Sequence, residues 1–99
     1  RSYNSWEIEQ GSATIVIGYY EQVRYIVGEA HLCKLPRKNI KVLYEYLLRE
    51  NYKLQELSFS VNEQDIILSF IIYDSYFTKE TAHEIFSNLI NKADHYDAI

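Results

Sequence analysis

Apolar residues alternate with polar ones in five stretches of the chain, which is the period expected of β-strands. In chain order, the predicted strands are 5–9, 13–20, 23–35, 57–61 and 66–73. Short polar connections join the first three, and Asn62-Glu63-Gln64-Asp65 forms a hairpin turn between the last two. Because short connections make consecutive strands antiparallel neighbours, we predict a single antiparallel sheet.

Apolar positions three and four residues apart predict two helices. The first begins at Pro36, whose missing N–H costs nothing in a first turn, and ends near Asn51. Its apolar stripe comprises Ile40, Leu43, Tyr44, Leu47 and Leu48. The second follows Thr78, a good N-cap, and runs to the chain end, with Phe86 and Leu89 as predicted core residues. We therefore predict an α+β fold: a two-layer, five-stranded antiparallel sheet with helices packed on it, in the order β-β-β-α-β-β-α.

Length and composition restrict the class of protein. The chain has 99 residues, 47% of them hydrophobic and 24% charged, as expected for one small globular domain. Ten basic against 14 acidic residues give a net charge of −4, which argues against nucleic-acid binding. No stretch reaches the roughly 20 apolar residues of a membrane-spanning helix, so no membrane partner is expected. A single cysteine excludes an internal disulfide and makes the cytoplasm the default location.

The two ends of the sequence point to a segment of a longer chain. It begins at Arg1 rather than at Met, and it stops at Ile99 inside a helical pattern. We expect residues 1–99 to form a single α+β domain taken from a longer protein.

Glu29, His31 and Cys33 alternate along the third predicted strand and could suggest a catalytic or metal site. Residues two apart on a strand are separated by about 7 Å, too far for a Cys–His hydrogen bond. A partly exposed strand face is the favoured interpretation. The neighbours His83 and Glu84 do not face each other on a helix either. We therefore predict a protein that is not an enzyme, with no metal, no cofactor and no small-molecule substrate.

Arg37, Lys38 and Lys41 lie in the first turns of the first predicted helix. Cations are disfavoured there by the helix dipole. Two interpretations stay open: a solvated basic corner, or a docking site for an acidic segment of a partner.

A set of spaced residues runs through the chain from Trp6 onward. In order, these are Trp6-x-Ile8, the strand around 15–19, Glu29-Ala30-x-Leu32-x-x-Leu35-Pro36, Leu47-Leu48-x-x-Asn51, Leu57-x-Phe59-x-Val61 and Ala93-Asp94-His95-Tyr96-Asp97. They resemble the YbjN-like family, whose fold is that of the type III secretion chaperones. The resemblance implies a small acidic domain, usually a homodimer, that binds another protein. The family usually carries a helix before the first strand, which this chain lacks.

Ten tyrosines are the one unusual feature of the composition, and tyrosine concentrates at interfaces. Tyr44 is expected in the core, whereas Tyr46, with Val42 and Arg49, lies on the side of the first helix opposite the apolar stripe. The resemblance implies dimerisation through this helix and the following strand. We hypothesise a partner-binding or self-association surface made of Val42, Tyr46, Arg49, Leu57, Phe59 and Val61; scattered surface apolar residues are the alternative.

Two functions remain as hypotheses. The first is a non-enzymatic protein-binding module of chaperone or adaptor type, which binds a protein partner or itself through an apolar helix and strand surface. The alternative is a structural or regulatory domain of a larger multidomain protein, packed permanently against its neighbours.

Overall fold

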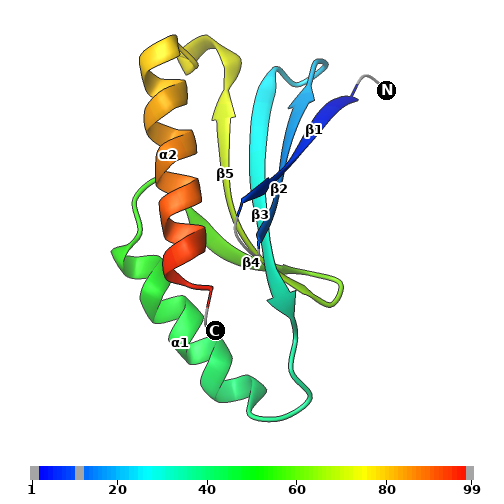
Figure 1. Cartoon of the computed structure of the whole chain (residues 1–99), viewed down its shortest axis with the longest axis vertical. Helices are drawn as coiled ribbons and strands as arrows, with labels where there is room; N and C mark the ends of the chain where they lie inside the picture. The colour runs from blue at the N-terminus through cyan, green and yellow to red at the C-terminus, as the bar shows by residue number, and fades with distance from the viewer. Residues whose placement is uncertain (1–2, 11–12, 98–99) are drawn as a thin grey trace.

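The computed structural model describes residues 3–10 and 13–97, and it shows one sheet with two helices (Figure 1). The strands are β1 (Tyr3–Gln10), β2 (Ala13–Tyr20), β3 (Tyr25–Lys34), β4 (Ser58–Asn62) and β5 (Asp65–Tyr73). The helices are α1 (Ile40–Lys53) and α2 (Lys79–His95), with a short 3₁₀ turn at Asp74–Tyr76. The predicted fold class is confirmed.

All neighbouring strands in the sheet pair antiparallel, in the order β1-β2-β3-β5-β4. The first three strands form the predicted meander, and β4 and β5 form the predicted hairpin. The segment α1–β4 is inserted between β3 and β5, which pair directly with each other. This insertion places β4 at one edge of the sheet and leaves β1 at the other.

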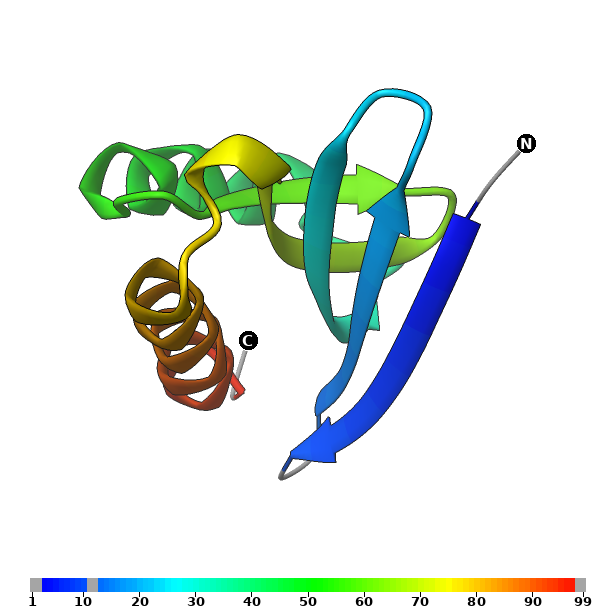
Figure 2. The same cartoon turned by 90° about the horizontal axis from the view of Figure 1, so that it is seen from above.

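The core lies between α2 and one face of the sheet (Figure 2). From α2 it contains Ile85, Leu89 and Ala93; from the sheet it contains Ile15, Ile17, Ala30, Phe59, Ile66, Leu68 and Phe70, together with Leu47 of α1 and with Leu57 and Tyr96. Leu89 is 1% exposed, so its assignment to the core is confirmed. Phe86 is half-buried, and its ring packs 5.7 Å from that of Phe70 and 5.6 Å from that of Phe77.

Thr78 begins α2 as predicted. Its hydroxyl oxygen accepts from the backbone N–H of Thr81 at 3.1 Å, and the Thr81 hydroxyl oxygen accepts from the backbone N–H of Thr78 at 2.7 Å. This reciprocal pair satisfies N–H groups that have no partner inside the helix.

The prediction for α1 was wrong in two respects. The helix begins at Ile40 rather than Pro36, because Asn39 takes a left-handed conformation (φ 61°) that cannot continue a right-handed helix. Of the predicted stripe, Leu47 is buried and Ile40 and Leu43 are half-buried, but Tyr44 and Leu48 are exposed. The reason is that α1 lies beside the edge strand β4 rather than across the sheet, so only a narrow line of its surface is covered.

Candidate protein-binding surface

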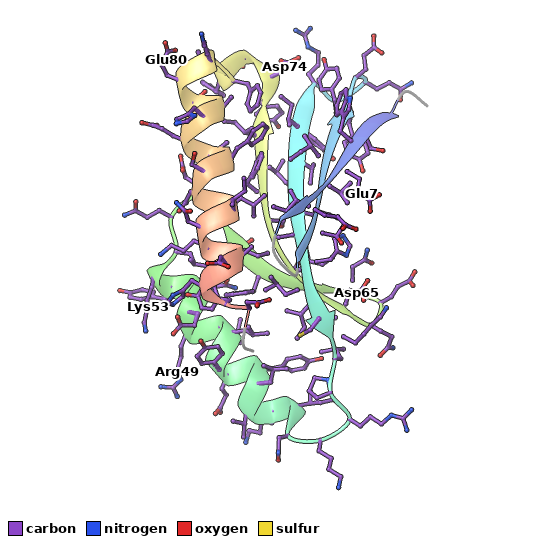
Figure 3. All side chains as sticks on the ribbon, viewed as in Figure 1. Glu7, Arg49, Lys53, Asp65, Asp74 and Glu80 are labelled. Atoms are coloured by element: carbon purple, nitrogen blue, oxygen red, sulfur yellow. The ribbon has the colours of Figure 1, made fainter. Side chains whose placement is uncertain are left out.

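The six residues predicted as a partner surface do not lie on one face of the molecule. Leu57 and Phe59 are buried in the core of the chain, because alternate residues of this segment point toward the helix layer. Val61 shares their side of β4 but lies near the end of the strand, where it is exposed. Val42, Tyr46 and Arg49 are exposed on α1, and Figure 3 shows Arg49 projecting away from the sheet. Their role in binding stays a prediction.

An apolar groove runs between α1 and β4. We call it the α1–β4 groove; it has a volume of about 280 Å³ and is lined by Tyr44, Leu47, Leu48, Asn51, Phe59, Ser60 and Val61. Tyr44 and Leu48 are followed four residues later by Tyr52, so the three form one line along the helix. Leu48 is 68% exposed and Tyr52 is 92% exposed. A continuous apolar line of this kind has no partner within the described part of the chain.

The sequence analysis assigned Tyr44 and Leu48 to the buried stripe and so missed that this side of α1 is exposed. One feature of the sequence could have revealed this exposure: apolar residues cover more of the surface of α1 than one buried stripe needs. Besides that stripe, the helix has apolar side chains at Val42 and Tyr46, and a helix at the edge of a domain buries only one side.

Asn51 fixes α1 to the edge strand by two hydrogen bonds. The backbone N–H of Phe59 donates to Asn51 Oδ1 at 2.6 Å, and Asn51 Nδ2 donates to the carbonyl oxygen of Phe59 at 3.4 Å. An edge strand otherwise leaves its outward backbone groups free to pair with another chain. Asn51 occupies those of Phe59, and it thereby ties the last turn of α1 to β4.

Replacing Asn51 with alanine should lower the free energy of unfolding by about 1–3 kcal/mol, because it leaves part-buried backbone groups of Phe59 without a partner. Asn88→Ala is the matched control, since the Asn88 side chain makes one exposed hydrogen bond, to the Gln55 carbonyl at 3.2 Å. Urea unfolding of both variants measures the difference. An Asn51→Ala loss no larger than that of Asn88→Ala would contradict the role given to Asn51.

Tyr96 joins the C-terminal end of α2 to α1 and β4. Its hydroxyl donates to Glu50 Oε1 at 2.7 Å, and its ring packs edge-on against Phe59 with a centroid distance of 4.8 Å. Burial, and then the hydrogen bond to Glu50, raise the pKa of Tyr96 to about 12. The same hydrogen bond, with one from Lys53 at 3.0 Å, lowers the pKa of Glu50. The Tyr96 hydroxyl therefore stays protonated and holds the end of α2 in place.

The polar candidates on β3 do not form one group. His31 Nε2 lies 3.3 Å from Glu29 Oε1, and His31 Nδ1 lies 3.6 Å from Asp65 Oδ2. The strand register shifts between His31 and Cys33, so Cys33 packs against the core instead of joining that face. Burial raises the pKa of the Cys33 thiol, which disfavours the reactive thiolate. Within residues 3–10 and 13–97, no three His, Cys, Asp or Glu side chains are placed to hold a metal ion.

A comparison with solved structures finds the same fold in another protein. The crystal structure of the ExsC–ExsE complex contains a similar chain: the TM-score is 0.76, the sequence identity is 14%, and the match covers 96% of this chain and 74% of that one. No family model and no curated protein matches the sequence. None of the described helices is both long enough and apolar enough to cross a membrane. The chain therefore shares its α+β fold, a five-stranded antiparallel sheet with two helices, with that chain of the ExsC–ExsE complex.

Proposed function

We propose that this chain is a non-enzymatic protein-binding module of the chaperone or adaptor type, and that it binds through the α1–β4 groove. One observation carries the proposal: the exposed apolar line of Tyr44, Leu48 and Tyr52 lies directly beside a groove at the edge of the sheet. Exposed apolar surface of this kind marks sites of protein contact. The fold is shared with a chain from a complex of two proteins, and the resemblance to the YbjN-like family favours a binding domain of this size.

A second copy of the chain is the occupant that the shape favours. The side chains of Leu48 and Tyr52 form a ridge, and the groove beside them opens between α1 and β4. In a dimer with two-fold symmetry, the same patch meets itself, so the ridge of each copy can fill the groove of the other. Arg49 and Glu45, exposed next to this line, would supply the polar rim that surrounds an apolar interface centre.

Leu48→Glu should weaken self-association by about tenfold or more, because a carboxylate in the interface must lose water without gaining a partner. Light scattering after size exclusion measures the mass against the 11.8 kDa of one chain. Wild type should exceed that mass at high concentration, whereas Leu48→Glu should return to it with an unchanged circular dichroism spectrum.

Ile71→Glu is the matched control, since Ile71 is 66% exposed, close to the 68% of Leu48, but lies on β5 and does not line the α1–β4 groove. It should assemble like wild type. The proposal fails if both variants lose assembly equally. It also fails if wild type stays at the mass of one chain at millimolar concentration; that result would favour the alternative of a structural or regulatory domain packed within a larger protein.

A further inference from the structure

A second open groove lies on the other side of the buried line of α1. We call it the α1–α2 groove; it has a volume of about 650 Å³ and lies between the end of β3, the first half of α1 and the end of α2. Its apolar lining consists of Cys33, Pro36, Val42, Leu43, Tyr46 and Tyr96. Val42 and Tyr46 are one helical turn apart, so they form one wall.

The floor of this groove is already ordered. Tyr96 is buried, and its hydroxyl is held by Glu50 at 2.7 Å. Leu43 and Cys33 are half-buried against the core, whereas Val42 is 66% exposed. A large apolar side chain could therefore enter without displacing a core residue, as in most preformed binding sites.

The segment that leads into α1 carries a concentration of positive charge, and two of its cations, Lys34 and Lys38, line the α1–α2 groove. Four of the ten basic residues lie between positions 34 and 41, a segment with no acidic residue, although acidic residues outnumber basic ones in the whole chain. They are Lys34, Arg37, Lys38 and Lys41. Figure 1 shows this segment as the loop at the lower end of the molecule, leading into α1.

Three of these cations have no acidic partner among the described residues. Lys34 Nζ pairs with Asp65 Oδ1 at 2.8 Å, but Arg37, Lys38 and Lys41 are exposed and make no ion pair with any residue that the structure describes. The first turn of α1 contains no acidic residue, and Asn39 makes no side-chain cap, so the positive end of the helix dipole adds to the same charge. The nearby Glu50 carboxylate is already engaged by Tyr96 and Lys53.

We propose that the α1–α2 groove binds an extended acidic segment of a partner protein. One aromatic or aliphatic side chain of that segment occupies the apolar lining, and Asp or Glu residues beside it contact Lys38, which lines the groove, and the neighbouring Arg37. The charge complementarity selects this occupant: on a protein with a net charge of −4, a cluster of basic residues is a place where an acidic segment gains an attraction that the protein's net charge does not supply. This site is separate from the α1–β4 groove and goes beyond the function proposed above.

Fluorescence anisotropy tests the proposal by measuring the affinity of a labelled peptide. The peptide has nine residues, with a central Trp between runs of Glu and Asp. Wild type should bind this peptide, and replacing its Trp with Ser should abolish most of the affinity. Lys38→Glu and Val42→Ser should each weaken binding, the former by about tenfold or more and increasingly so at low salt.

Two controls separate this site from other sources of binding. Lys79→Glu makes the same charge reversal at the start of α2, at the other end of the molecule, and should leave the affinity unchanged. Leu48→Glu should alter assembly but not peptide binding, so the two proposals can fail independently. The α1–α2 proposal is overturned if wild type does not bind the peptide, if the Ser peptide binds equally well, or if Lys38→Glu and Lys79→Glu have equal effects. An apolar groove beside basic residues could also hold a fatty acid. The proposal is therefore overturned as well if the groove binds laurate and not the peptide.

Discussion

Truncating Leu89 to alanine should lower the free energy of unfolding by about 2–5 kcal/mol, the range for removing a large aliphatic side chain from a packed core. Leu89 is 1% exposed and lies in the middle of the only helix that covers the sheet face in the described part of the chain. A small domain has only about 5–15 kcal/mol of stability in total. The variant should therefore unfold at a much lower urea concentration than wild type.

Val42→Ala is the control for this prediction, because it also truncates an aliphatic side chain on a helix, at a residue that is 66% exposed and lies outside the α1–β4 groove. Its unfolding free energy should change by less than about 0.5 kcal/mol. Urea unfolding followed by circular dichroism measures both variants. Equal losses in the two would show that α2 is not docked on the sheet as the structure describes.

Gly28→Ala should also destabilise the protein, by about 1–3 kcal/mol, because the core beside it is already filled. Gly28 of β3 pairs directly with Phe70 of β5, and a Cβ at position 28 would overlap the Phe70 ring. Phe70 is buried and packs against Phe86 with a ring distance of 5.7 Å, so its ring cannot move aside freely.

A double-mutant cycle checks the cause of this loss. Phe70→Leu removes the ring atoms that meet the new methyl group, so Gly28→Ala should cost less in that background than in wild type. Gly18→Ala provides the control on β2, where Gly18 borders a shallow surface hollow with Val16, and should cost less than Gly28→Ala. Additive losses in the cycle would show that the two positions do not compete for space.

The order of elements could be predicted from the sequence because the apolar pattern switches sharply between two spacings. Apolar residues alternate in the strands, and they recur every three or four residues in the helices. The alternation of Leu57, Phe59 and Val61, for example, predicted β4 to within one residue. The bulge near Cys33 could not be predicted in this way. A strand with an extra residue keeps an alternating sequence, and only the pairing with β5 shows that Cys33 has changed sides.

The apolar character of α1 was predictable, but the direction in which each side chain faces was not. Apolar residues on α1 extend from Val42 and Tyr46 on one side to Tyr44 and Leu48 on the other. The periodicity alone cannot decide which part of so wide a surface is buried. Contact with the edge strand β4 decides it, because only Leu43 and Leu47 fall on the line that faces the core.

Photocrosslinking from position 52 tests binding through the α1–β4 groove most directly. Benzoylphenylalanine replaces Tyr52, which is 92% exposed at the end of the apolar line, and in a control protein it replaces Tyr76, which is also exposed but lies in the turn before α2. Irradiation of the purified protein should give a crosslinked dimer from position 52, joined to α1 or β4 of the second copy, and none from position 76. No crosslink from position 52 at millimolar concentration, or equal crosslinking from both positions, would contradict the proposed surface.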